Sequence, residues 1–488
     1  MRSAPKKLQP FIIQVSRTMA LSLAMMFLLS ARAENTPQGS VTEGVFRNND
    51  TVCLIGDSIT HSGMYHSYLQ LFYVTRFPQM HLKFINCGIS GDSASGMLSR
   101  LQKDVFSNNA TVATLSAGMN DVGRGLYSQM KVPEDAAIKK SKAIEDYKHN
   151  VEKISDELSK KGIRQIFLTP TIYDENFETT TESMRGVNGA LEKCSDFILE
   201  FAKSHHAPSV DLWHPMEEVN RTHQQTDKQF TLIGKDRIHP GAVGHLVMAY
   251  LFLNQTKAPS DVWRLDLDAK SGHVISETNC EVSDITPTAK GVVFKNKELA
   301  LPFPEIEDAK QAYELVPFVE RLNQQVLQIR NLSEGSYTLK INGLEIGNYP
   351  QSALQQGINL AVSPTTPQMG RSQEIAKLCK EQHSLGSTIR TLRRVEIKHL
   401  SGVDLANKEA VKSSLESFIA DKQAHKNDPA ANSGYYIKTA QTYLKEIGNE
   451  SAILERMNAI DQEIYRINQP ETYSYSVEKQ KSTTPPVK

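Results

Sequence analysis

The chain has 488 residues and carries 55 Lys and Arg residues against 55 Asp and Glu residues, so its formal net charge is zero. This length exceeds one ordinary domain core, and two or three domains are expected. The balanced charge offers no field that would attract nucleic acid or an anionic membrane, which argues against such partners and leaves enzymes open.

The N-terminal stretch is typical of a secretory signal peptide. Basic residues precede the apolar run MALSLAMMFLL (19–29), and the small-residue segment SARA follows it. Eleven apolar residues are too few to span a bilayer, which argues against a membrane anchor. We expect cleavage near Ala33, which makes residues 1–33 a signal peptide and residues 34–50 a linker. The protein would then be exported to the periplasm or the cell exterior.

Residues 51–257 alternate between short apolar segments and longer amphipathic ones. The apolar segments predict strands at 51–56, 82–87, 111–117, 164–170 and 208–213. Continuous apolar strands separated by helices indicate a parallel sheet that is covered on both faces. Ligands of such sheets bind beyond the carboxyl ends of the strands, so we expect the functional residues there.

The pattern changes after about residue 258. Several strand-like segments follow, and Asn342-Gly343 is a strong hairpin-turn signal. We therefore expect a small β-rich module at 258–365. Residues 366–480 show apolar side chains at helical spacing and predict a helical C-terminal region, and the polar residues 481–488 predict a disordered tail.

Five cysteines are spread along the chain without the close spacing of a metal site. Cys53 and Cys87 fall inside strand-like segments and are most simply small buried hydrophobic residues. One disulfide among the five stays open for an oxidising compartment, but the sequence indicates no pair. We expect neither a metal nor a cofactor.

The motif GDSI places Ser58 at the end of the first predicted strand. A serine at a strand-to-helix turn is usually an N-cap, but it can also be a nucleophile held within reach of a substrate. A hydrolytic serine needs a base, a carboxylate that orients the base, and donors for the developing oxyanion. We interpret the neighbouring carboxylate of Asp57, and that of Asp121, as turn and cap residues.

Two loop histidines follow the last predicted strand, and both occur in the form Asp-x-x-His-Pro. The two copies are DLWHP (211–215) and DRIHP (236–240). In the second copy, Pro240 opens an almost wholly apolar helix, a favoured place for proline, and this helix would fix His239 on a rigid element. We therefore prefer Asp236 and His239 as carboxylate and base. His214 of the first copy is then structural or lines the wall of a pocket.

Two turns are candidates for the oxyanion donors. GISGD places Gly91 after the second predicted strand, where the missing side chain lets the backbone approach a ligand closely. GMND presents the side-chain amide of Asn120 after the third strand. Taken singly, the first is a helix-entry turn and the second a turn asparagine, but together they complement Ser58 and the Asp-His pair.

These four blocks, in this order, resemble the SGNH hydrolases, also called GDSL esterases. The resemblance covers about residues 51–257 and implies a three-layer α/β/α, flavodoxin-like fold with a parallel sheet. It implies that Ser58 is the nucleophile, His239 the general base and Asp236 the residue that orients it. The oxyanion hole would consist of the backbone N–H groups of Ser58 and Gly91 and the side chain of Asn120.

The sequence thus predicts an exported serine esterase that hydrolyses ester bonds through an acyl-enzyme. The stretch GDSITHSGMYHSYLQLF is more similar to the carbohydrate-acting branch of the family, so we expect an O-acetyl carbohydrate esterase. Its partner would be a small-molecule or polysaccharide ester, with no nucleic acid and no membrane insertion after signal cleavage. The alternatives are a lipase, lysophospholipase or thioesterase on the same site, and a non-catalytic glycan-binding protein on an esterase scaffold.

Overall fold

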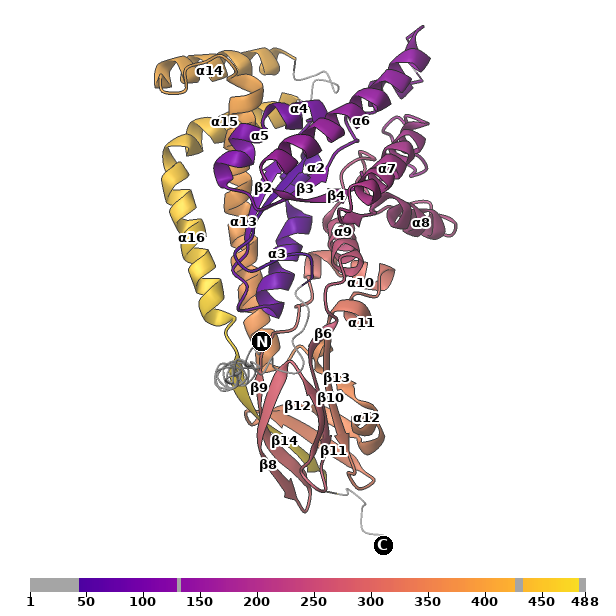
Figure 1. Ribbon diagram of the computed structural model, residues 1–488, viewed down its shortest axis with the longest axis vertical. Coiled ribbons are helices and arrows are strands. Elements are labelled where there is room, and N and C mark those ends of the chain that lie inside the picture. The colour runs from indigo at the N-terminus through magenta and orange to yellow at the C-terminus, as the bar shows by residue number, and fades with distance from the viewer. Residues whose placement is uncertain (1–43, 130–132, 426–432, 482–488) are drawn as a thin grey trace, which may run out of the picture. The chain divides into compact units, whose positions relative to one another are not determined.

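The computed structural model describes residues 44–129, 133–425 and 433–481 (Figure 1). The predicted signal peptide lies outside these residues, as do the first part of the predicted linker and nearly all of the predicted tail. Phe46, near the end of that linker, is buried and its ring packs against Tyr73 and Phe252. Because this aromatic side chain is removed from water, the linker prediction is wrong from about this residue onward.

A parallel sheet of five strands forms the centre of the α/β region, as the sequence predicts. The strands are β1 (Thr51–Gly56), β2 (Lys83–Gly88), β3 (Val112–Ser116), β4 (Arg164–Leu168) and β5 (Ser209–Val210), in the order β2-β1-β3-β4-β5. Nearly all residues of β1 and β3 are buried, because these strands lie inside the sheet and are covered on both faces.

The helices that pack on the sheet form two groups, and the helices within each group contact one another. One group contains α3 (Met64–Arg76) and α9 (Ala242–Gln255), and the other contains α4 (Ala94–Ser99), α6 (Ala136–Lys160) and α7 (Val187–Ser204). This arrangement confirms the predicted three-layer α/β/α fold (Figure 1). The remaining elements of this region are α2 (Ser58–Ser62), α5 (Leu101–Asp104), η1 (Phe106–Asn108), η2 (Arg124–Tyr127) and α8 (Trp213–Gln224).

A β-rich region follows, also as expected, and it contains two sheets that share one hydrophobic core. The four-stranded sheet has the order β13-β10-β6-β7 and the five-stranded sheet the order β12-β11-β14-β9-β8. The strands are β6 (Asp261–Asp268), β7 (Val274–Thr278), β8 (Cys280–Thr288), β9 (Gly291–Glu298), β10 (Gln324–Arg330), β11 (Ser336–Ile341), β12 (Leu344–Pro350), β13 (Ile358–Asn359) and β14 (Glu471–Lys479). Short helical segments connect them: η3 (Glu307–Ala309), α10 (Ala312–Leu315), α11 (Phe318–Leu322), α12 (Gln351–Gln356) and η4 (Leu360–Val362).

The last strand of this region comes from the segment that we predicted to be helical. β14 lies between β11 and β9 and runs antiparallel to both. Its side chains alternate between core and solvent, with Tyr473, Tyr475 and Val477 buried. The helical prediction for 366–480 is therefore wrong for these nine residues. Their period-two pattern is that of a strand, and their partner strands lie more than a hundred residues earlier in the chain.

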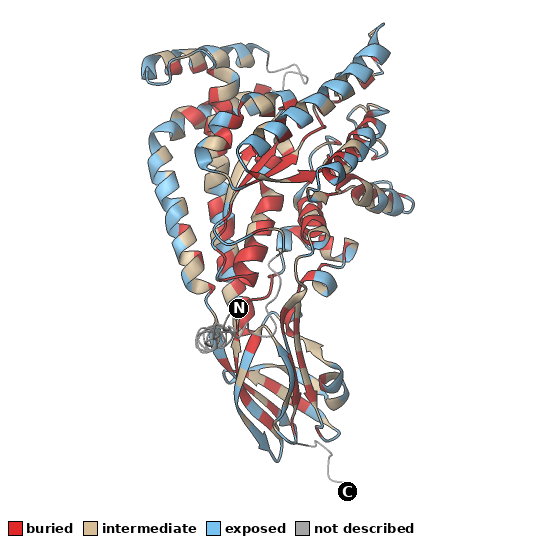
Figure 2. Cartoon of the chain, viewed as in Figure 1, coloured by how far each residue is buried: buried red, intermediate tan, exposed pale blue. Residues whose placement is uncertain are grey.

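Between β13 and β14 the chain is helical, as predicted. The elements are α13 (Pro367–His399), α14 (Lys408–Ala424), α15 (Ser433–Glu446), η6 (Ile447–Asn449) and α16 (Glu450–Ile467). Ile375 of α13 and Ile460 and Ile464 of α16 are buried in the same core as the α/β region. Figure 2 shows that α13 carries many buried residues, whereas most of α16 is exposed or half-buried. Since α13 also contacts α3 and β2, it packs along the edge of the parallel sheet.

The hydrophobic core of the α/β region extends beyond the domain boundary that we placed at residue 258. Leu301, Phe303 and Phe318 lie within the expected β-rich module, yet they are buried in the core of the α/β region. The five cysteines are buried and free in the structure. In the part of the chain that the structure describes, no helix is long and apolar enough to cross a membrane.

Candidate active site

Ser58 is the first residue of α2 and follows β1 almost directly. Asp57, between them, is the N-cap of the helix, since its Oδ1 accepts the N–H of Ile59 at 2.9 Å. The cap role considered for Ser58 is therefore wrong, and the cap role expected for Asp57 is confirmed. Burial raises the pKa of the Asp57 carboxyl to about 6. The Ser58 hydroxyl does not serve as the cap, and it bonds a residue that is distant in the sequence.

That partner is His239. Its Nε2 lies 2.7 Å from Oγ of Ser58, although the two residues are 181 positions apart. On the other side of the ring, Nδ1 lies 2.5 Å from Oδ2 of Asp236. A carboxylate at Nδ1 favours the tautomer whose Nε2 lone pair faces the serine hydroxyl. The structure thus brings together the three residues that the sequence singled out as nucleophile, base and orienting carboxylate.

The Asp236 carboxylate is held in its charged form by its surroundings. Burial raises the pKa of Asp236, but hydrogen bonds from the side chain and backbone of His239 and from the backbone of Ile238 bring it down to about 2. The two backbone N–H groups both donate to Oδ1 at 3.0 Å. The carboxylate therefore stays ionised at neutral pH and carries the negative charge that an imidazolium at this position needs.

Arg237, between these two residues, holds their loop in place. Its backbone adopts φ = 69°, a left-handed conformation that is uncommon outside glycine. The buried guanidinium donates to the carbonyl oxygens of Asp174, Phe177 and Thr181, which lie in the loop after β4. Our sequence reasoning missed this residue. The sequence offered one indication of its role, namely a charged side chain inside the motif DRIHP, next to the apolar Ile238.

The other Asp-x-x-His-Pro copy forms a similar pair without a serine. Nδ1 of His214 lies 2.9 Å from Oδ2 of Asp211, at the start of α8. The Nε2 atom of that ring faces Oδ1 of Asp196 at 3.8 Å instead of a hydroxyl. The structure therefore distinguishes two local motifs that look alike in the sequence.

The candidate oxyanion donors follow the three neighbouring strands β2, β1 and β3. Gly91 has φ = 76°, in the region that favours glycine, and a side chain added there would meet open space. In the described residues, the backbone N–H groups of Ser58 and Gly91 donate to no protein acceptor. Nδ2 of Asn120 donates to the carbonyl oxygen of Asp92 at 2.8 Å, which leaves its second N–H available.

Asp121 ties two of these loops together. Its Oδ1 accepts the N–H of Ala94 at 2.8 Å and its Oδ2 accepts the N–H of Gly118 at 2.9 Å. These contacts confirm the turn role expected for Asp121, whose pKa burial raises to about 7. A nearby residue that we missed is Arg124, which donates from Nη1 to Oδ1 of Asn120 at 3.1 Å.

The candidate site is open to solvent. The side chains of His239 and Asp236 are 44% and 49% exposed, and Gly91 is exposed as well. An ester could therefore present its carbonyl to Ser58 while a large alcohol portion extends into water.

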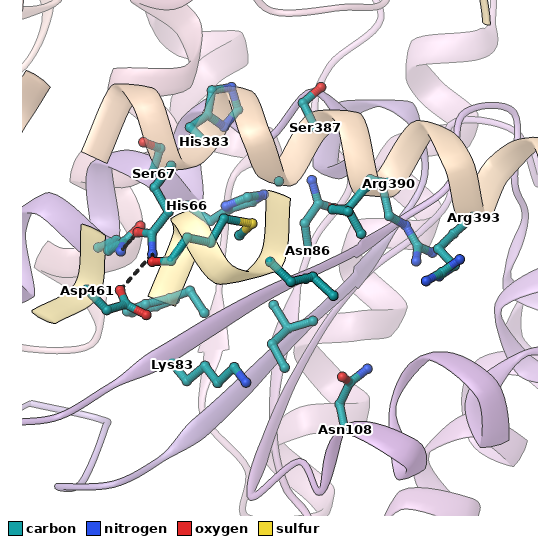
Figure 3. A pocket seen from close by; sticks show the side chains of 18 of the residues that line it. His66, Ser67, Lys83, Asn86, Asn108, His383, Ser387, Arg390, Arg393 and Asp461 are labelled. Atoms are coloured by element: carbon teal, nitrogen blue, oxygen red, sulfur yellow. Dashed lines mark hydrogen bonds between the residues drawn. The ribbon is translucent and has the colours of Figure 1, made fainter. Parts of the chain in front are cut away.

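A separate cavity of about 640 Å³ lies along the free edge of β2, where α13 and α16 form the opposite wall (Figure 3). Its lining includes His66, Lys83, His383, Arg390 and Asp461, but none of the residues assigned to the serine site. Among the described residues, no group of His, Cys, Asp and Glu side chains could hold a metal ion.

Comparisons with known proteins place the α/β region in a family. Residues 54–247 match the GDSL-like lipase/acylhydrolase family. Over 223 residues, the chain is 23% identical to an acetylxylan esterase of Geobacillus stearothermophilus. The aligned region covers 43% of this chain and 94% of that protein. The crystal structure of that acetylxylan esterase matches with a TM-score of 0.35 and 20% identity, over 43% of this chain and 94% of the other.

A further similarity extends beyond the α/β region. A solved structure of a gut microbial diltiazem-metabolizing enzyme superimposes with a TM-score of 0.79 at 28% identity, over 89% of this chain and 98% of that one. The β-rich region and the C-terminal helices are thus shared with this enzyme. Residues 54–247 form a GDSL-like lipase/acylhydrolase domain, and the chain is a hydrolase that acts on esters.

Proposed function

We propose that the chain is a serine esterase that removes O-acetyl groups from carbohydrates or similarly bulky alcohols by way of an acyl-enzyme on Ser58. The observation that carries this proposal is the hydrogen-bonded series from Oγ of Ser58 through the His239 ring to Asp236, with distances of 2.7 and 2.5 Å. Such a series is the arrangement that activates a serine hydroxyl for attack on a carbonyl carbon.

In the first half of the proposed reaction, Nε2 of His239 takes the Oγ proton as Ser58 attacks the ester carbonyl. The developing oxyanion is stabilised by the N–H groups of Ser58 and Gly91 and by the free N–H of Asn120. Asp236 stabilises the imidazolium. When the C–O bond breaks, His239 returns the proton to the departing alcohol oxygen and the acyl group stays on Ser58.

In the second half, a water molecule takes the place of the alcohol. His239 removes one proton from this water, whose oxygen attacks the acyl carbon. The second tetrahedral intermediate collapses, Oγ of Ser58 leaves and regains its proton from His239, and the carboxylic acid departs. The enzyme is then restored without any net change.

The substrate class rests on two supports. One relative is an acetylxylan esterase, and the compound named for the other, diltiazem, carries one O-acetyl ester. The exposed His239 and Asp236 side chains leave room for a large alcohol portion. A short acyl group with a bulky alcohol is therefore the substrate that we propose. The alternatives, a lipase, lysophospholipase or thioesterase and a non-catalytic glycan-binding protein, are outcomes of the test below.

The test compares purified wild-type protein with Ser58→Ala in the release of acetate from acetylated xylan, diltiazem and p-nitrophenyl acetate. Ser99→Ala is the control, because Ser99 is an exposed serine whose hydroxyl bonds only within α4. We expect Ser58→Ala to be inactive and Ser99→Ala to match the wild type. Wild-type activity in Ser58→Ala would overturn the proposed nucleophile, and faster hydrolysis of octanoyl than of acetyl esters would favour a lipase.

We propose further that the protein is exported and that residues 1–33 are removed. The basic, apolar and small-residue order of the N-terminal stretch supports this proposal. N-terminal sequencing of the mature protein from an exporting host should then begin at Glu34. An uncleaved N-terminus in that host would contradict the proposal.

A further inference from the structure

Helix α13 reaches the loop that carries Gly91, although the two lie about 300 residues apart. Nζ of Lys398, near the end of the helix, lies 3.0 Å from Oδ1 of Asp92, the residue after Gly91. Two turns earlier, Nε of Arg390 donates to the carbonyl oxygen of Gly88 at 2.5 Å. The C-terminal helices therefore contact the candidate oxyanion loop through two cations.

Asp92 links this contact to the oxyanion donors. Its carboxylate is buried, with 3% of the side chain exposed, and Nε of Arg100 binds its other oxygen at 2.7 Å. Its carbonyl oxygen accepts the hydrogen bond of Asn120 at 2.8 Å. A movement of Asp92 would thus move both the preceding N–H of Gly91 and the amide of Asn120.

Arg100 connects the same loop to the strands beneath it. Its guanidinium donates to the carbonyl oxygens of Cys87 at 2.7 Å and Gly56 at 3.1 Å, at the carboxyl ends of β2 and β1. It also lies 2.5 Å from Oδ2 of Asp104, the carboxylate that Arg390 binds at the same distance. Arg100, between α4 and α5, thus shares the two buried carboxylates of Asp92 and Asp104 with cations of α13.

The loop is also held from the side of the nucleophile helix. Nδ1 of His61, in α2, accepts the N–H of Ser90 at 3.2 Å and lies 3.0 Å from its hydroxyl. Burial lowers the pKa of His61 to about 3, so the ring remains a neutral acceptor at neutral pH. The segment 88–92 is therefore held between α2 on one side and α13 on the other.

We infer that α13 is part of the esterase site and that Lys398 is a positioning residue for the oxyanion donors. The inference rests on the proposed function. Lys398 does not reach the reacting atoms; it acts through Asp92, whose position sets those of Gly91 and Asn120. Oxyanion donors act only when they lie about 2.7–3.1 Å from the charge that develops, and a displacement of about 1 Å can cost on the order of 100-fold in rate.

The contribution of Lys398 to overall stability is expected to be small. Its side chain is 33% exposed, and α13 is anchored separately by Ile375 and Cys379 in the main core. Partly exposed ion pairs contribute about 1 kcal/mol or less. Lys398→Met should therefore leave the protein folded and loosen the loop.

The experiment measures kcat and KM for p-nitrophenyl acetate in the wild type, Lys398→Met, Lys398→Arg and Lys380→Met. Lys380 is the matched control, because it lies on the same helix and pairs with Asp308 at an exposed position. For Lys398→Met we expect kcat to fall roughly 10-fold with KM within about 2-fold, the signature of a contact that matters in the transition state. Lys398→Arg should recover most of the activity, and Lys380→Met should match the wild type.

A second measurement separates positioning from a merely structural role. A trifluoromethyl ketone adds to the serine and places an oxyanion in the site, so its affinity should weaken by the same factor as kcat in Lys398→Met. The melting temperature should stay close to that of the wild type. If Lys398→Met does not fold, Lys398→Gln takes its place with the same expectations.

The possible results separate this inference from the proposed function. An inactive Ser58→Ala together with a fully active Lys398→Met overturns the role of Lys398 alone. An equal loss in Lys398→Met and Lys380→Met, or a change in KM without a change in kcat, overturns it as well. Full activity in Ser58→Ala overturns the proposed function itself.

Discussion

Arg124 donates from Nη1 to Oδ1 of Asn120 at 3.1 Å, while Nδ2 of the same amide donates to the carbonyl oxygen of Asp92 at 2.8 Å. The two bonds determine which way the Asn120 amide faces, because its oxygen must accept and its nitrogen must donate. They also place a positive charge behind the amide that we propose as an oxyanion donor.

Removal of the Asn120 amide should therefore reduce kcat strongly. Loss of one oxyanion donor typically costs about 100- to 1000-fold in kcat, and we expect Asn120→Ala to fall in this range. Arg124→Met should cost roughly 10-fold, since it removes the orienting bond but leaves the donor. The measurement is kcat for p-nitrophenyl acetate, and a double variant should lose no more than Asn120→Ala alone. Fully additive losses would contradict a role of Arg124 through Asn120.

The two Asp-x-x-His-Pro copies allow a direct comparison. His239→Ala should lower kcat by on the order of 10⁴-fold or more, because Ser58 loses its base. His214→Ala should keep kcat close to that of the wild type, since His214 pairs with Asp211 and not with a serine. Asp236→Asn should also cost on the order of 10⁴-fold through the wrong tautomer of His239. A severe loss in His214→Ala with normal activity in His239→Ala would reverse our assignment.

A buried carboxyl group in the β-rich region should make stability depend on pH. Glu298 is 2% exposed, and burial raises its pKa to about 7 even though several side chains donate to it. These donors are Trp263, Gln325, Gln368 and Tyr475. Because the folded-state pKa lies above the unfolded-state value, the contribution of Glu298 is greatest at low pH and is lost as the pH rises through about 7.

Glu298→Gln removes this titration. Between pH 4.5 and 8.5, the free energy of unfolding of the wild type should fall relative to that of Glu298→Gln by on the order of 3 kcal/mol. Urea unfolding of both proteins at several pH values measures this difference, and other titrating groups cancel in it. A constant difference across the range would show that Glu298 titrates normally.

A buried cation joins the α/β region to the β-rich region. Arg76, the last residue of α3, donates to the carbonyl oxygens of Pro259, Asp261 and Leu322 at 2.8, 3.1 and 2.9 Å. Arg76→Met leaves these carbonyl groups without their donor, and we expect it to lower the free energy of unfolding by about 3 kcal/mol. Arg456→Met, which removes an exposed ion pair with Glu381, should cost less than about 1 kcal/mol. Equal losses in the two variants would contradict the importance of this junction.

Local sequence was sufficient for most of the α/β region. The five parallel strands, the helices between them and the roles of Asp57 and Asp121 all depend on periodicity and turn chemistry within a few residues. Ser58, Gly91 and Asn120 were found because each lies in a short block just after a strand, whereas Asp236 and His239 were found in an Asp-x-x-His-Pro motif before α9. A parallel sheet brings such ends to one edge whatever the sequence between them.

Other features were beyond local patterns because their partners are distant. β14 was missed, since a strand at the end of a helical region is defined by its pairing with β9 and β11. The sequence favoured the second Asp-x-x-His-Pro copy through the apolar helix that Pro240 opens, and the distance of 2.7 Å between Ser58 and His239 agrees with that preference. Nothing around Lys398 in the sequence points to Asp92.

The sequence by itself determined the fold class, the family and the residue types of the site, because these follow from hydrophobic period and from short motifs. The tertiary structure placed the preferred His239 against Ser58, and it decided that Asp57 and not Ser58 caps α2 and that α13 contacts the loop of Gly91. These depend on contacts between residues up to about 300 positions apart, whose closeness is set by packing of the whole core and not by any local preference of the chain.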